Sequence, residues 1–121
     1  MKQLSWICLL FFFLTEAVFA GEADVVAVEF DQTGKQTYRF NVTVLHTDSG
    51  WDHYADRWEV LAPDGSILDT RTLAHPHTNE QPFTRSLSGV KISADIHQVT
   101  IRAHDSTHGF GGKKMTVDLH R

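Results

Sequence analysis

Hydrophobic and polar residues alternate along most of this chain after residue 20, with the period of a β-strand rather than that of a helix. The alternation is clearest over residues 37–46, where every second residue from Tyr38 to Val44 is hydrophobic. Turn-forming residues separate the alternating segments, as in the Pro-Asp-Gly-Ser sequence of residues 63–66. The pattern predicts seven strands, over residues 25–30, 37–46, 56–62, 67–73, 83–87, 98–105 and 114–120.

One face of each predicted strand is hydrophobic, and these faces predict the core. We expect the core to contain Phe40, Val42, Trp58, Val60, Val99, Ile101, Val117 and Leu119. On the first strand, Val26, Val28 and Phe30 share one face and are predicted to point inward. Gly89 is predicted to lie in the connection that follows the fifth strand.

Seven short strands in about 100 residues are typical of an antiparallel β-sandwich, so the predicted fold class is all-β. The segment SLSGVKISADIHQVTIRAHDSTHGFGG (residues 86–112) resembles the end of a fibronectin type III or immunoglobulin-like domain. Trp58 on the third strand is similar to the core tryptophan of the immunoglobulin class. The chain lacks the paired cysteines and the corner tyrosine, whose place Ile96 or His97 takes. The resemblance implies a seven-strand immunoglobulin-like sandwich and no particular function.

The first twenty residues have the composition of a secretory signal peptide. Lys2 supplies a positive charge, an apolar stretch runs from Leu4 to Leu14, and small residues precede the expected cleavage before Gly21. The apolar stretch is too short to cross about 30 Å of hydrocarbon. We therefore expect residues 1–20 to be removed, with the lone Cys8, and residues 21–121 to form one secreted or periplasmic domain without a membrane span.

A formal net charge of −4 argues against nucleic acid or an anionic membrane as the partner. The unusual feature of the composition is histidine, with eight residues in the whole chain. Six of them lie on three predicted loops, two on each: His46 and His53, His75 and His77, and His104 and His108. Because connections in a sandwich alternate between its two ends, these three loops are expected at the same end.

Neutral imidazole binds zinc and copper(II), and three histidines with a carboxylate or water make an ordinary site. We expect several of the six histidines to bind one such ion, with Asp105 and Asp52 orienting them. Asp48 and Glu80 accompany the same loops. His46 keeps the inward parity of its strand and Asp105 that of the sixth, so these two side chains are expected to meet above the core.

Two alternatives remain open at this point. The same loops carry Trp51, Tyr54 and Phe110, and exposed aromatic residues of this kind bind proteins or glycans. Loop histidines are also often only solvated or bonded to a nearby carbonyl. Catalysis by a serine triad is not favoured, because Ser106 is merely adjacent to Asp105 and the geometry of a triad spans a fold. A metal-dependent hydrolase or redox enzyme is the weakest hypothesis. The sequence thus favours an exported binding protein, with a metal ion, a protein or a glycan as its partner.

Overall fold

The computed structural model describes residues 21–120, and these form strands and loops without a helix. The predicted signal peptide lies outside the described residues. Every predicted strand is present, with ends that differ by at most a few residues. The strands are β1 (Asp24–Gln32), β2 (Thr37–Leu45), β3 (Ala55–Leu61), β4 (Ile67–Thr72), β5 (Phe83–Lys91), β6 (Gln98–Asp105) and β7 (Met115–Asp118).

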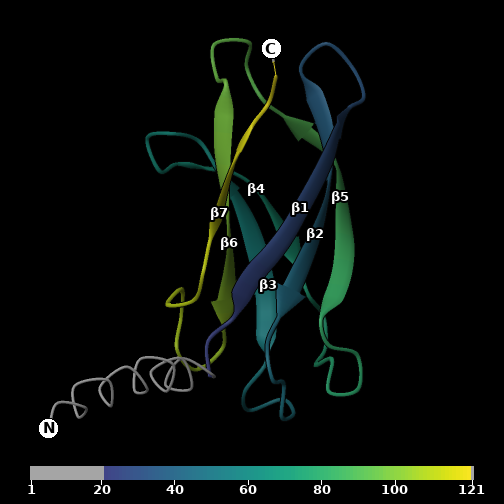
Figure 1. Cartoon of the computed structure of the whole chain (residues 1–121), viewed down its shortest axis with the longest axis vertical. Helices are drawn as coiled ribbons and strands as arrows, with labels where there is room; N and C mark the ends of the chain where they lie inside the picture. Colours follow the sequence, from purple (N-terminus) through teal and green to yellow (C-terminus); the bar gives the residue numbers. More distant parts are fainter. Residues whose placement is uncertain (1–20, 121) are drawn as a thin grey trace, which may run out of the picture.

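The strands form two antiparallel sheets that face each other (Figure 1). One sheet has the order β1-β2-β5, and the other has the order β4-β3-β6-β7. The prediction of an all-β sandwich is confirmed, and it agrees with the resemblance to immunoglobulin-like domains at the level of the fold. Across residues 21–120 we find no helix with the length and apolar character that crossing a membrane requires.

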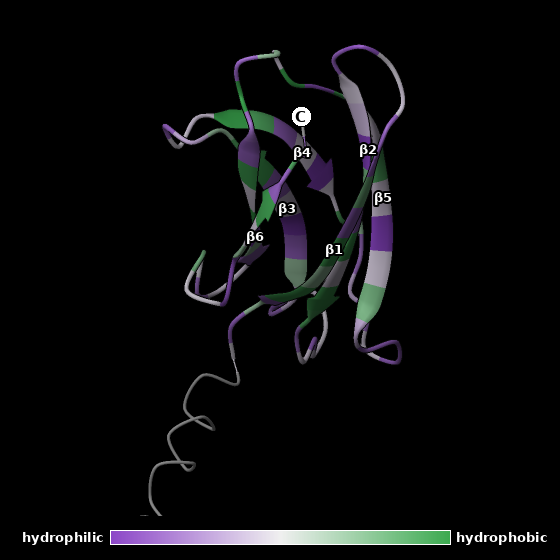
Figure 2. Cartoon of the chain, turned by 45° about the horizontal axis from the view of Figure 1, so that its top comes forward, coloured by the Kyte–Doolittle hydropathy of each residue, from purple (hydrophilic) through white to green (hydrophobic). Residues whose placement is uncertain are grey.

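The core lies between the sheets and is built by the alternation that the sequence shows. Along β2, Tyr38, Phe40, Val42 and Val44 are fully buried, and Figure 2 shows hydrophobic and hydrophilic residues alternating along the strands. The predicted core residues are buried except Val117, which is half-buried and packs against the core from the edge strand β7.

The predicted inward face of the first strand is wrong at Val26, which is 41% exposed. The reason is a β-bulge near the start of β1, an edge strand of its sheet. Val25 pairs with Val44 and Ala27 pairs with Thr43, so Val26 is an extra residue and the alternation shifts by one. Val25 takes the buried position instead.

The prediction that Gly89 lies in a connection is also wrong, because β5 continues to Lys91. Opposite Gly89, the pairing with β2 steps from Tyr38–Val90 to Phe40–Leu87, which leaves an extra residue in β5. Gly89 has a φ of 71°, a conformation that glycine adopts without strain. The glycine therefore marks a bulge within the strand and not its end.

Three loops meet at the end of the sandwich where the described chain begins, the lower end in Figure 1. They are the β2–β3, β4–β5 and β6–β7 loops, which carry most of the histidines. The fold thus brings three histidine-bearing segments, far apart in the sequence, to one end of the core.

Replacing Phe40 with alanine should lower the free energy of unfolding by about 3–5 kcal/mol, because the ring is fully buried between the sheets. Urea unfolding followed by circular dichroism measures this change. The matched control is Ile67→Ala on β4, where the side chain is 53% exposed and the expected change is within about 0.5 kcal/mol. Similar losses from both variants would contradict the assigned core.

Candidate metal centre

The inward alternation of β2 continues into the loop that follows the strand. Val42, Val44, His46 and Asp48 are all buried, so the hydrophobic row of the core ends in a histidine and an aspartate. On the facing sheet, the buried row of β6 ends in Asp105. The Nε2 atom of His46 lies 2.8 Å from Oδ2 of Asp105, and both side chains are fully buried. The expected meeting of these two residues above the core is confirmed.

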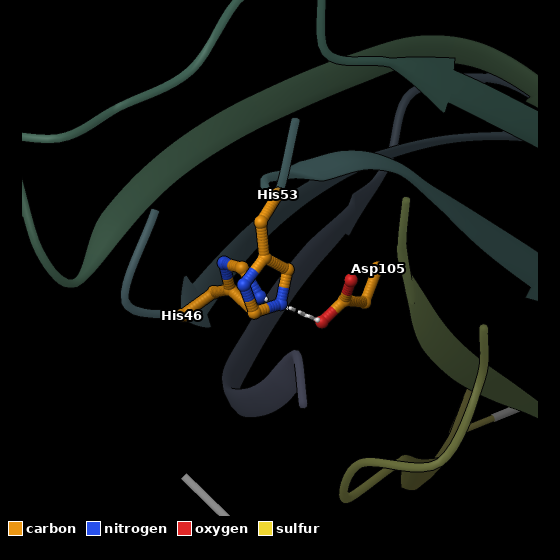
Figure 3. A group of neighbouring side chains, drawn as sticks. All are labelled: His46, His53 and Asp105. Atoms are coloured by element: carbon orange, nitrogen blue, oxygen red, sulfur yellow. Dashed lines mark hydrogen bonds and ion pairs between the residues drawn. The ribbon is translucent and has the colours of Figure 1, made fainter. Parts of the chain in front are cut away.

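Two further histidines reach the same carboxylate oxygen. Nε2 of His53, from the β2–β3 loop, lies 2.8 Å from Oδ2 of Asp105, and Nδ1 of His108, from the β6–β7 loop, lies 3.1 Å from it. Figure 3 shows the rings of His46 and His53 side by side, with the carboxylate facing them. The donor atoms of His46, His53 and Asp105 all lie within 4.8 Å of one another.

The backbone of its own loop fixes the Asp105 carboxylate. Its Oδ1 atom accepts hydrogen bonds from the backbone N–H groups of Thr107, at 2.6 Å, and His108, at 3.1 Å. Burial alone would raise the pKa of Asp105, but the bonds from Thr107, His108, His46 and His53 together outweigh it and hold the pKa far below its usual range. Asp105 is therefore an ionised carboxylate at the centre of the cluster.

Asp48 supports the cluster from behind. Its Oδ1 atom contacts Nδ1 of His46 and accepts the backbone N–H of Ala55 at 3.2 Å, and its Oδ2 accepts that of His77 at 2.6 Å. From the sequence, Asp52 was expected in this orienting role instead. Asp52 is exposed, and it is its backbone carbonyl that accepts a bond, from the Thr107 hydroxyl at 3.1 Å. The continued alternation from Val44 would have identified Asp48.

His75 and His77 lie beside the cluster rather than in it. The ring of His77 stacks on Phe83 with 4.0 Å between centroids, and His75 is exposed, with its ring 4.9 Å from that of His77. Burial lowers the pKa of His77, and the positive charge of Arg85 and the neighbouring His75 lower it further. The connection to the cluster runs through the backbone of His77 and Asp48.

The structure also separates His104 from the cluster. Because His104 precedes Asp105 on β6, its side chain points to the opposite face of the sheet. There its Nδ1 atom lies 2.7 Å from Oδ1 of Asp56 and 3.2 Å from Arg57. The same alternation that places Asp105 inward would have excluded His104.

The predicted aromatic surface is likewise divided. Trp51 is 67% exposed and its ring meets that of Tyr54 edge-on, with 5.6 Å between centroids. Phe110 instead lies on the outer face of the sheet, where the Arg102 guanidinium covers its ring at 3.8 Å and His104 flanks it at 4.7 Å. Phe110 therefore belongs to a different surface from Trp51 and Tyr54.

One further member of the cluster, which the sequence does not predict, is the backbone carbonyl of Gly21. Its oxygen lies 3.1 Å from Nε2 of His53 and 3.0 Å from Nδ1 of His108. Three imidazole nitrogens and two oxygens, from Asp105 and Gly21, thus converge at one place. This set of donors can hold a metal ion or a shared network of protons.

In the metal-free protein, His108 should titrate above the ordinary pKa of about 6.5 and His77 below it. The hydrogen bond to Asp105 raises the pKa of His108, whereas burial lowers that of His77. The contact of protonated His108 with Asp105 therefore stabilises the fold below about pH 6.5, and this contribution is lost as the pH rises through the folded-state pKa. NMR titration of the ring protons, after treatment with a chelator, shows which of the two histidines has the higher pKa.

The control for this titration is Asp105→Asn, which removes the negative charge beside His108 and leaves the stacking of His77 on Phe83 in place. The pKa of His108 should fall in this variant while that of His77 stays where it was. An unchanged His108 would contradict the assigned contact.

Comparison with known proteins adds one relative. No protein-family model matches the chain, and no solved structure matches it. The chain is 42% identical over 97 residues to a protein of Halomicrobium mukohataei described as "Putative lipoprotein". The aligned region covers 80% of this chain and 47% of the relative, so the chain spans about half the length of that protein.

Proposed function

We propose that this protein is exported and binds one transition-metal ion, zinc or copper(II), through His46, His53, His108 and Asp105. The proposed role is binding rather than catalysis. One observation carries the proposal: each ring nitrogen of the buried His46 faces a carboxylate, Asp48 on one side and Asp105 on the other.

A neutral imidazole has one N–H and can donate to only one of these carboxylates. If Nδ1 donates to Asp48, the lone pair on Nε2 points at the negative oxygen of Asp105, 2.8 Å away, which is repulsive unless the two atoms share a second proton or a metal ion. A metal ion satisfies both sides at once. The bond from Nδ1–H to Asp48 is then the contact that commonly orients a metal-binding histidine.

The crowding at Asp105 supports the same interpretation. Two backbone N–H groups and three ring nitrogens surround this carboxylate, which makes five contacts. A carboxylate offers about four lone-pair sites. Three of the five partners share Oδ2, which has two lone pairs, whereas an ion among the rings would take the nitrogen lone pairs and leave Oδ2 as one more ligand.

The donor types and their spacing favour zinc or copper(II). The convergent donors are imidazole nitrogens and oxygens, which suit zinc and copper(II) better than copper(I). Zinc–nitrogen bonds of about 2.0–2.1 Å require ligand atoms within about 4 Å of one another. The present upper limit of 4.8 Å, for His46, His53 and Asp105, needs only a small contraction.

Export rests on the signal-peptide composition of residues 1–20. The similarity to a protein described as a lipoprotein is consistent with an exported or envelope-associated chain. The predicted location, secreted or periplasmic, therefore remains part of the proposal.

The exposure of Trp51 favours a second candidate function, the binding of a protein or glycan. An exposed tryptophan braced by Tyr54 resembles the aromatic anchors of binding surfaces. Phe110, covered by Arg102, does not contribute to this surface. A partner of this kind would lose affinity with Trp51→Ala and would be indifferent to removal of a metal ion.

The double substitution His53→Ala and His108→Ala should abolish stoichiometric binding of zinc or copper(II), because it removes two of the three ring nitrogens from the site. The loss of affinity should exceed the roughly 10–100-fold that follows from losing a residue that only orients a ligand. Elemental analysis of the purified protein gives the stoichiometry, and titration against a competing chelator gives the affinity.

The matched control is His75→Ala with His104→Ala, which removes two histidines from the same end but outside the cluster. This variant should keep one ion per chain with nearly unchanged affinity. Equal losses from both double variants would indicate diffuse surface binding and overturn the proposal.

A further inference from the structure

The segment that begins the predicted mature chain lies directly on the histidine cluster. The Gly21 carbonyl oxygen is 3.0 Å from the ring of His108 and 3.1 Å from that of His53. Gly21 is also the residue at which the sequence predicts the new N-terminus after signal cleavage. Two independent features, one of sequence and one of geometry, therefore coincide at this residue.

The β6–β7 loop holds this segment in place. The backbone N–H of Val25 donates to the carbonyl of Lys113 at 2.8 Å, and the Lys113 N–H donates to Oδ1 of Asp24 at 2.7 Å. The adjoining glycine at position 112 lets the two backbones approach, because a Cβ atom there would lie 1.9 Å from the carbonyl oxygen of Ala23. The start of the domain is thus fastened to the loop that carries His108.

The contact at Gly21 itself is equally close. A Cβ atom on this residue would lie 2.9 Å from Cε1 of His108, so a larger side chain would push against the ring. Because glycine has no side chain, the backbone carbonyl of residue 21 can approach the two imidazole rings as closely as a metal-binding side chain would.

We propose that the α-amino group of Gly21, freed when residues 1–20 are removed, binds the same metal ion together with the Gly21 carbonyl oxygen. The inference rests on the proposed metal site and extends it. The nitrogen and the carbonyl oxygen of one residue are separated by two carbon atoms, so both can bind one ion in a five-membered chelate ring. Before cleavage, the nitrogen of Gly21 belongs to a peptide bond and its lone pair is delocalised.

This ligand links metal binding to export. The uncut chain offers the histidines and Asp105, whereas the cut chain adds an amine and completes a chelate. Mixed nitrogen and oxygen ligands that include an amine suit copper(II) in a tetragonal arrangement, and we infer that copper(II) is preferred over zinc.

The test compares exported chains that differ at the N-terminus. One chain is unaltered, and a second has one glycine inserted between Ala20 and Gly21, so that cleavage leaves residue 21 within a peptide bond. A matched control has one glycine inserted between Gly34 and Lys35, in the exposed β1–β2 turn at the other end of the sandwich. Mass spectrometry gives each N-terminus, and copper(II) affinity is measured against a competing chelator.

The insertion beside Gly21 should weaken copper(II) binding by more than about tenfold, while the control insertion leaves the affinity unchanged. Paramagnetic resonance of the copper-loaded insertion variant should show one nitrogen ligand fewer, a change that a purely structural effect would not produce. Thermal unfolding of the metal-free chains should give similar midpoints.

The other outcomes separate this inference from the proposed function. Equal affinities and equal nitrogen couplings in all three chains would overturn the role of Gly21 and leave the histidine site standing. A mature chain that begins elsewhere than Gly21 would also overturn it. If none of the three chains binds copper(II) stoichiometrically, the proposed metal site fails and the inference fails with it.

Discussion

The burial of charge at one end of the core is the constraint on which this molecule depends. Asp105, Asp48 and His46 have fully buried side chains, directly above the hydrophobic rows of both sheets. An uncompensated buried carboxylate costs several kcal/mol or neutralises by taking up a proton. Backbone N–H groups therefore donate to Oδ1 of Asp105 and to both oxygens of Asp48, and the loops that supply them acquire a defined conformation.

This arrangement explains how long loops are held without a disulfide. Asp105 fixes the start of the β6–β7 loop by accepting the backbone N–H groups of Thr107 and His108. Asp48, in the β2–β3 loop, accepts the backbone N–H of His77 and so connects its loop to the β4–β5 loop. The two carboxylates act as polar cross-links between segments that a hydrophobic core does not reach. A cation bound among the histidines, as proposed, would strengthen these links and so organise the loops at this end of the domain.

Much of the fold could be predicted, because alternation reports directly which face of a strand is buried. The same rule predicted that His46 and Asp105 would meet, since both extend the inward row of a strand beyond its hydrophobic part. Applied to the neighbouring positions, it would have excluded His104, one residue before Asp105, and selected Asp48, two residues after His46.

The remaining errors have a different origin. The bulges at Val26 and Gly89 insert one residue and shift the alternation, and only the pairing with β2 reveals them. The contact of the Gly21 carbonyl could not be predicted from the sequence either, because every residue has a backbone carbonyl group. Such contacts depend on where the chain passes and not on the side chain that it carries.

The exposure of the clustered side chains indicates how an ion would enter the proposed site. His46 and Asp105 form a fully buried floor, whereas the side chains of His53 and His108 are 26% and 43% exposed. An ion arriving from solvent would meet the exposed rings first and then reach the fixed carboxylate below them. The floor supplies negative charge in a region from which water is excluded, where attraction to a divalent cation is stronger than at the surface. In the proposed site, the buried floor would be in place before an ion arrives, and the two exposed rings would complete the set of ligands afterwards.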